Sequence, residues 1–252
     1  SYKLFKGDEL RIPPVKISTK ENQFVPSKII SLLKEAIVEE NNDYIAINKP
    51  EGIASHGGSG ISIGVIETIR NFGKNYRDAK LVHRLDKDTS GCQIIAKNNK
   101  FLRRCNKLIA DRKVKKTYQA VVHGNWNHKD GFYEINIEKN LLMGKERMVK
   151  ISEGGKIAKT FFQSIKSSKY FSLIQCELVT GRTHQLRVHL SELGNPIVGD
   201  KKYGSKENNY SKFLNFKNRM YLHANSFVSE ELNIDLSIKP PKEFKKILKN
   251  DE

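Results

Sequence analysis

The sequence has only three cysteines, one tryptophan and comparatively few acidic residues. Cys92, Cys105 and Cys176 lie far apart and form no C-x-x-C pair, which argues against a disulfide framework and indicates a reducing compartment. No stretch reaches the ~20 apolar residues that a membrane helix needs. The opening "SYKLFKGDEL" also lacks the apolar run of a signal peptide. We therefore expect a cytoplasmic protein that makes no contact with a membrane.

The shortage of acidic residues leaves a strongly basic chain. Lys and Arg number 45 against 28 Asp and Glu, so the formal net charge is +17. A field of this sign attracts polyanions, which makes nucleic acid the first partner to consider. A generally basic protein with many solvated lysines would have the same composition. The 252 residues, 38% of them hydrophobic, are enough to bury the core of one large domain or two modest ones.

The hydrophobic pattern predicts more strands than helices. "PSKIISLLKE" predicts a short helix with Ile29, Ile30, Leu32 and Leu33 on its inner face, and "AIVEENNDYIAINKP" predicts a β-hairpin. "CQIIAK", "KTYQAVVHG" and "YFSLIQCELV" are typical of strands. "THQLRVHLSELG" predicts a helix that Thr183 can cap and that ends at Gly194. This irregular alternation predicts an α+β fold with a mixed sheet.

The segment "HRLDKDTSG", residues 83–91, combines two carboxylates with basic side chains. Asp86 follows the apolar "LVHRL" and precedes "TSG", which predicts partial burial. A half-buried aspartate that a guanidinium keeps ionised is suited to attack on, or stabilisation of, a sugar anomeric carbon. An ordinary charged turn, in which Asp86 accepts hydrogen bonds from local backbone amides, is the preferred interpretation of these nine residues alone.

A metal site is not predicted. Asp86 and Asp88 have no third acidic ligand at motif spacing. His184 and His189 are five residues apart, whereas two ligands on one helical face are four apart.

"HRLDKDTSG" resembles the signature of the RluA-type pseudouridine synthases. Five further blocks resemble that family in the family's order, namely "NKPEGIASHGGSG", "KKTYQAVVHG", "GKIAKT", "VTGRTHQLRVHL" and "NPIVGDKKYG". Together they cover roughly residues 43–204, and "LHANSF" in the tail is similar as well. The stretch "HGGSGISIGVIETIR" looks closest to a subgroup that acts on large-subunit (23S) ribosomal RNA.

The resemblance implies a fold, a reaction and a set of catalytic residues. The fold is a mixed, mostly antiparallel central sheet flanked by helices and loops, with the active-site cleft across the sheet. The reaction isomerises uridine in RNA: the N1 glycosidic bond breaks, the base rotates, and C5 joins the same sugar. Asp86 matches the catalytic aspartate, which acts as nucleophile at C1′ or assists a glycal intermediate. Tyr118 matches the tyrosine that stacks on uracil and acts as or near the base, and Arg187 matches the arginine expected to pair with Asp86.

Further residues are expected to bind RNA. Arg84 matches the arginine that enters the RNA stack when the target base is flipped out, as it must be because pairing hides C1′ and C5. His83 is expected to orient or pack, and Ile197 to supply an apolar wall of the uracil pocket. Lys49, Thr89 and Arg182 complete the expected substrate-binding set. The isomerisation changes neither redox state nor atom count, so we expect no metal or organic cofactor. The expected partner is 23S rRNA or its precursor, bound by a bacterial monomer.

Residues 1–25 resemble the C-terminal end of an S4-type RNA-binding domain followed by a linker, with most of that domain absent from the chain. Residues 26–252 are then the catalytic domain. Two other functions remain open: a non-catalytic rRNA-binding or ribosome assembly factor on the same scaffold, and a hydrolase of N-glycosidic bonds in which water completes the reaction.

Overall fold

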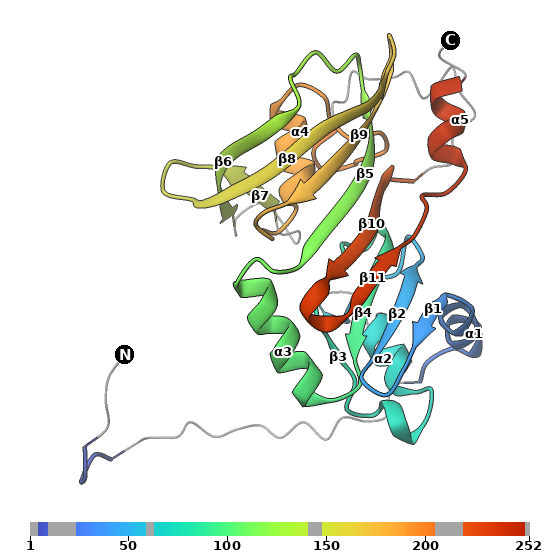
Figure 1. Ribbon diagram of the computed structural model, residues 1–252, viewed down its shortest axis with the longest axis vertical. Helices are drawn as coiled ribbons and strands as arrows, with labels where there is room; N and C mark the ends of the chain where they lie inside the picture. The colour runs from blue at the N-terminus through green and yellow to red at the C-terminus, as the bar shows by residue number, and fades with distance from the viewer. Residues whose placement is uncertain (1–4, 10–23, 59–62, 141–147, 205–218, 250–252) are drawn as a thin grey trace.

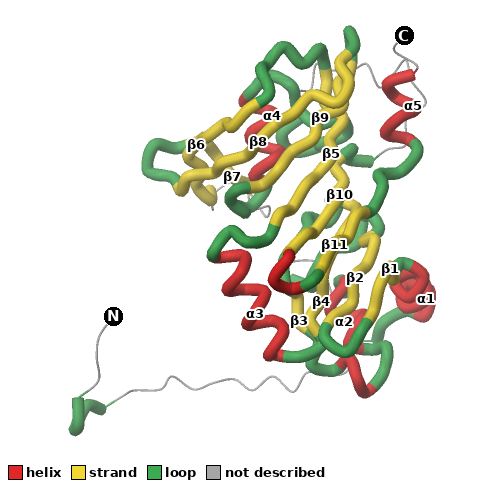
Figure 2. The backbone as a smooth tube through the Cα atoms, viewed as in Figure 1, coloured by secondary structure: helices red, strands yellow, loops and turns green. Residues whose placement is uncertain are grey.

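Figure 1 shows the computed structural model of the chain, which describes residues 5–9, 24–58, 63–140, 148–204 and 219–249. A long, curved sheet runs through the molecule, and helices pack on its faces (Figure 2). The strands are β1 (Ile37–Glu40), β2 (Tyr44–Lys49), β3 (Lys80–Leu81), β4 (Ser90–Ala96), β5 (Lys115–His123), β6 (Gly131–Asn140), β7 (Met148–Ile151), β8 (Lys156–Ser167), β9 (Phe171–Leu178), β10 (Leu222–Ser229) and β11 (Ile234–Ser237).

The sheet order is β1-β2-β4-β10-β5-β9-β8-β6-β7, with β3 paired to β4 and β11 to β10. Among the described strands, β4 and β10 form the one parallel pair, and all other pairs are antiparallel. The predicted mixed, mostly antiparallel sheet of an α+β fold is therefore confirmed. The parallel pair joins the half of the sheet that contains β1 to β4 with the half that contains β5 to β9.

The helices cover both faces of the sheet. They are α1 (Ser27–Glu35), α2 (Val65–Arg70), α3 (Asn99–Ala110), α4 (Gln185–Glu192) and α5 (Glu243–Lys249), with 3-10 turns η1 (Lys74–Tyr76) and η3 (Glu230–Leu232). Helices α1 and α2 pack on the face of β2 and β4 that carries Ile45 and Ile95, whereas α3 packs on the opposite face, against Ile94. Helix α4 packs on the face of β5 that carries Tyr118, and α5 on the face that carries Val121. Helix α3 buries one apolar stripe, as amphipathic helices on a sheet do, whereas α4 is buried on all sides from Gln185 to Leu190.

Two details of the predicted helices are wrong. Leu32 of α1 is 42% exposed, because Leu33 occupies the inward position of that turn. Thr183 does not cap α4: the residue before the helix is His184, in a left-handed conformation with φ 53°, and no side chain caps the first turn. Gly194 does end the helix in the left-handed region, with φ 77°.

The N-terminal segment is described only at residues 5–9. Here Gly7 adopts φ 107°, and the Asp8 amide donates to the carbonyl oxygen of Phe5 at 3.1 Å, which forms a turn. The remainder of the expected S4-like segment, at 1–4 and 10–23, lies outside the described residues. Within the described ranges, no helix is long and apolar enough to span a membrane.

Candidate active site

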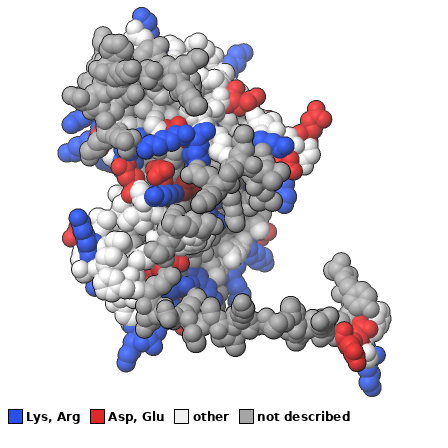
Figure 3. Space-filling model, turned by 180° about the vertical axis from the view of Figure 1, so that it is seen from behind, with Lys and Arg blue, Asp and Glu red and all other residues white. Residues whose placement is uncertain are grey.

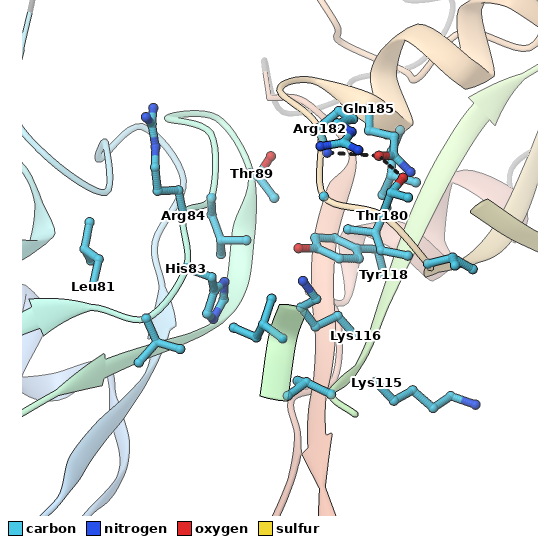
Figure 4. A pocket seen from close by; sticks show the side chains of 18 of the residues that line it. Leu81, His83, Arg84, Thr89, Lys115, Lys116, Tyr118, Thr180, Arg182 and Gln185 are labelled. Carbon is cyan, nitrogen blue, oxygen red and sulfur yellow. Dashed lines mark hydrogen bonds between the residues drawn. The ribbon is translucent and has the colours of Figure 1, made fainter. Parts of the chain in front are cut away.

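A cleft of about 1490 Å³ lies across the middle of the sheet. One wall is the segment from Leu81 to Thr89, and the other is the loop after β9, including Thr180 and Arg182. Tyr118 of β5 lies between the two walls (Figure 4). The cleft therefore lies where the two halves of the sheet meet, across the sheet as predicted.

The loop between β3 and β4 holds Asp86 in this cleft. Ser55 fixes the preceding residue twice, since its Oγ donates to the Leu85 carbonyl at 2.6 Å and accepts from the Leu85 amide at 2.9 Å. The Thr89 amide donates to the Asp86 carbonyl at 3.1 Å, which closes the turn. The backbone of Asp86 is thus fixed, while its carboxylate stays 29% exposed and can meet a ligand.

Arg187 of α4 contacts two carboxylates. Its Nη1 donates to Asp86 Oδ2 at 3.1 Å, so the pair expected from the sequence is present. Its Nε and Nη2 donate to Asp200 Oδ2 and Oδ1, both at 2.7 Å. Burial alone would raise the pKa of Asp200, but the hydrogen bonds and charge of Arg187 outweigh burial and hold it below its ordinary value. Asp200 is therefore an anion, and its two-point contact orients the guanidinium toward Asp86.

The turn that precedes α4 brings further groups to this cluster. Gln185 accepts hydrogen bonds through Oε1 from the Thr180 hydroxyl at 2.8 Å and the Arg182 amide at 3.0 Å (Figure 4). His184 lies with Nε2 at 3.8 Å from Asp86 Oδ2, and its Nδ1 contacts the Tyr203 hydroxyl at 2.8 Å. Burial lowers the pKa of His184. The left-handed conformation at His184 thus aims an imidazole at the carboxylate.

Tyr118 lies in the hydrophobic cluster beneath the cleft, and only 7% of its surface is exposed. Burial raises the pKa of its phenol, and the charge of Asp86 raises it further. The hydroxyl therefore keeps its proton at neutral pH. A neutral phenol ring at this place is suited to stack on a planar base.

Four of the residues expected to bind RNA line the cleft. Arg84 and Arg182 carry exposed guanidinium groups, and Thr89 is buried in the wall. His83 accepts through Nε2 from the Ile94 amide at 3.1 Å and stacks on Phe227. Burial, with a smaller effect of the Lys116 charge, lowers the pKa of His83 to about 3. His83 is thus a neutral group that packs in the wall of the cleft.

Lys49 and Ile197 do not line the cleft. The Nζ of Lys49 is fully buried and donates to three carbonyl oxygens, those of Pro50 and Ile53 at 2.7 Å and of Lys87 at 3.1 Å. Burial lowers its pKa to about 7. Ile197 is bridged to Val122 and belongs to the cluster that includes Tyr118. This geometry therefore does not support direct contact of either residue with a substrate, because both side chains are buried and make contacts within the protein.

Asp200 was missed at the sequence level, although it lies in "NPIVGD", a matching block. The signal was present: it is the one charged residue of this hexamer and follows the apolar Ile197 and Val198, and a buried carboxylate needs a cationic partner. Tyr203, three residues further along the same block, was missed as well. It contacts His184, and its ring also lies 5.1 Å from the Arg187 guanidinium carbon.

The surface around the cleft is rich in cations. Figure 3 shows Lys and Arg side chains near the middle of one face, with a few acidic side chains among them. Some cleft cations are paired, such as Lys115 with Glu177 at 2.8 Å and Lys113 with Glu231 at 3.0 Å. The remaining positive charge suits a polyanion that carries its own phosphates.

Comparison with known proteins gives consistent results. The family profile for RNA pseudouridylate synthase matches residues 43–192. The chain is 40% identical over 255 residues to ribosomal large subunit pseudouridine synthase C of Pasteurella multocida, covering 98% of this chain and 78% of that protein. It is 39% identical over 227 residues to the protein of the same name from Escherichia coli K12, covering 88% and 71%.

Solved structures resemble the chain as well. Human RNA pseudouridylate synthase domain containing 1 aligns with a TM-score of 0.68 and 25% identity, covering 82% of this chain and 83% of the human one. Human RNA pseudouridylate synthase domain containing 4 aligns with a TM-score of 0.71 and 24% identity, covering 88% and 95%, and supports the fold alone.

Proposed function

Because the chain belongs to the RNA pseudouridylate synthase family, as its sequence blocks predicted, we propose that the cleft converts uridines of large-subunit ribosomal RNA to pseudouridine. The observation that carries this proposal is the Asp86–Arg187–Asp200 cluster. It supplies one partly exposed carboxylate beside a guanidinium that a second, buried carboxylate orients. The cluster faces a cleft wide enough for a nucleotide and bordered by cations.

Asp86 acts at the sugar. Arg187 stabilises the anionic carboxylate, which attacks C1′ or assists formation of a glycal while the N1–C1′ bond breaks. Uracil departs with the bonding electrons and rotates, and C5 then bonds to C1′. The C5 proton leaves and N1 gains a proton, so the product has the same atoms as the substrate. Both routes use the same carboxylate, and the geometry of Asp86 is compatible with each.

Tyr118 and Arg84 act on the base and the RNA stack. Tyr118 stacks on the uracil, and its neutral phenol supports this role in the free protein better than that of a base. Arg84 lies exposed on the wall opposite Tyr118 and fills the space that a flipped nucleotide leaves. Arg182 contacts the same strand of RNA, and Thr89, which is buried, supports the wall that carries Arg84.

The proposed substrate rests on the relatives' names and on charge. Both bacterial relatives are named for the large ribosomal subunit, and the net charge of +17 favours a polyanion. The chain then acts in the bacterial cytoplasm, where ribosomal RNA is made, and as a monomer. Residues 26–252 form the catalytic domain in this proposal, and residues 1–25 the end of an S4-type RNA-binding domain with its linker.

The proposal is tested by incubating the chain with large-subunit rRNA transcripts and mapping pseudouridine. The matched pair is Asp86→Asn and Asp88→Asn. Each variant removes one negative charge, the first from the proposed catalytic position and the second from a solvent-exposed position two residues away. We expect modification by the wild type and by Asp88→Asn, and none by Asp86→Asn. An unmodified transcript would favour the non-catalytic binding factor, and free uracil would favour the hydrolase. Activity that survives in Asp86→Asn would overturn the catalytic assignment.

A further inference from the structure

Lys116 occupies the cleft beside Tyr118. The two residues are separated by one position on β5, so their side chains lie on the same face of the strand. Lys116 is half-buried and points into the cavity between the two walls (Figure 4). A Cβ built on Gly181 would lie 3.9 Å from its Nζ, which places the amine against the loop after β9. Its charge also acts on His83 of the opposite wall.

The Lys116 ammonium has no anionic partner within the described part of the chain. Nearby lysines differ, since Lys113 and Lys115 are exposed and paired with glutamates at 3.0 and 2.8 Å. Burial lowers the pKa of Lys116, and no neighbouring carboxylate offsets this effect. A half-buried ammonium without a counter-ion costs free energy in the free protein. A ligand that brings negative charge to Nζ would remove this cost.

The reaction assigned above produces such a charge. In either route the N1–C1′ bond breaks and both of its electrons stay with uracil, whose negative charge is shared with its carbonyl oxygens. We propose, on the basis of the proposed function, that Lys116 is a further catalytic residue whose ammonium group donates a hydrogen bond to a uracil carbonyl oxygen and stabilises the departing uracil anion. When C5 bonds to C1′ and N1 is protonated, this charge disappears. A preplaced donor that meets charge only as it develops accelerates the step.

A backbone phosphate is the other anion that RNA could bring to Nζ, and the position of Lys116 favours the base. The exposed cations Arg84 and Arg182 lie toward the solvent, where a phosphodiester remains. Lys116 lies deeper, on the strand face of the tyrosine that stacks on uracil. A flipped base enters the deepest part of a cleft, whereas its phosphates stay at the mouth.

The test compares Lys116→Met, Lys116→Arg and the neighbouring control Lys115→Met, which removes an exposed, paired lysine from the other face of β5. Single-turnover cleavage of the N1–C1′ bond and the dissociation constant for RNA are measured separately. Each is measured with a uridine target and with 5-fluorouridine, whose fluorine withdraws electrons and stabilises the anion without the lysine. For both targets, the cleavage rate is followed as the loss of the N-glycosidic nucleoside.

We expect Lys116→Met to slow cleavage of the uridine target about 100-fold, the size found when a charge-stabilising donor is removed. The loss with 5-fluorouridine is smaller, the affinity for RNA is unchanged, and Lys116→Arg recovers part of the rate. The thermal unfolding midpoint of Lys116→Met is equal to or above that of the wild type, because an unpaired charge is removed. Lys115→Met behaves as the wild type does.

Equal losses with both targets, or a wild-type rate in Lys116→Met, would overturn the assignment. A loss confined to affinity would make Lys116 a phosphate ligand instead. A wild-type chain that forms no pseudouridine would contradict the proposed function itself, which keeps the two failures distinct.

Discussion

Asp200 holds Arg187 by both of its carboxylate oxygens, with Nε and Nη2 each 2.7 Å away, and leaves Nη1 for Asp86. The two carboxylates differ in how far they are buried. The Asp200 side chain is 1% exposed, whereas the Asp86 side chain remains 29% exposed. Arg187 is therefore oriented from the protein interior, and Asp86 can change its bonding during a reaction without releasing the guanidinium.

Asp200→Asn removes the orienting charge but keeps the shape of the side chain. We expect the free energy of unfolding to fall by about 3 kcal/mol, since breaking a buried pair leaves Arg187 partly uncompensated. The single-turnover rate falls as well, because the guanidinium loses its fixed direction toward Asp86. Denaturant unfolding and rapid-quench kinetics measure the two effects. Asp235→Asn, an exposed control on β11, changes neither. An Asp200→Asn enzyme with the wild-type rate would show that Arg187 needs no second carboxylate.

Buried neutral histidines predict a loss of stability in mild acid. Burial lowers the pKa of His223 to about 4, and three other histidines have pKa values lowered to about 3 or 4 by burial, namely His83, His123 and His189. An unfolded histidine titrates near 6.5, so between pH 6.5 and 4 the unfolded chain binds more protons than the folded one. The stabilisation is complete above about pH 6.5 and is lost as the pH falls toward 4.

His223→Asn tests this relation. His223 is fully buried, with Nδ1 2.9 Å from the Ser90 hydroxyl oxygen and Nε2 3.1 Å from the Ile238 carbonyl oxygen. The variant is less stable than the wild type at pH 7, because it loses these contacts. Between pH 7 and pH 5 the free energy of unfolding of the variant falls by about 2 kcal/mol less than that of the wild type, because the variant lacks the histidine that only the unfolded chain protonates. Urea unfolding at the two pH values measures the difference, and equal losses of stability in the wild type and the variant would mean that His223 has the same pKa in the folded and the unfolded chain.

The sequence predicted which residues meet in the cleft better than it predicted the residues that hold them in place. Asp86, Tyr118 and Arg187 lie in blocks with distinctive residues, and the structure brings all three to one cleft. Asp200 was missed because its isolated charge in the block does not identify its partner, and the bidentate contact with Arg187 is made only by the fold. Lys49 was assigned to the RNA for the converse reason: a lysine in a matching block resembles a phosphate ligand until its three carbonyl partners are seen.

The fold was predictable where periodicity is strong. The hairpin of β1 and β2 and the strand β5 follow from local patterns. The parallel pairing of β4 with β10 does not, because it joins Ser90 to His223, residues far apart in sequence. Only the packed protein selects such a pair, since long-range contacts leave no periodic signal in either strand.

Gly91→Ala tests the parallel pairing of β4 with β10. Gly91 has φ +111°, and a Cβ there would lie 2.2 Å from the Ala224 carbonyl oxygen, which no backbone can accommodate in place. We expect a loss of several kcal/mol, roughly 3 or more, and a fall in soluble yield. Gly131→Ala is the matched control, because a Cβ at Gly131 meets nothing within 4 Å. Equal thermal midpoints for the two variants would show that the β4–β10 pairing tolerates displacement.

Arg84→Ala distinguishes two roles of Arg84: insertion of its side chain into the RNA stack, and attraction of its charge to the RNA phosphates. If Arg84 fills the space left by the flipped base, its loss affects a paired target more than an unpaired one, because only the paired target must be unstacked and opened, at a cost of a few kcal/mol. We expect the single-turnover rate to fall about 10-fold on a stem-loop with a paired target uridine, and less than about 3-fold on an unstructured oligonucleotide. Lys87→Ala is the control, since it removes an exposed positive charge from the same segment. Equal losses on both substrates would make Arg84 a phosphate contact, because phosphate attraction does not depend on whether the base is paired.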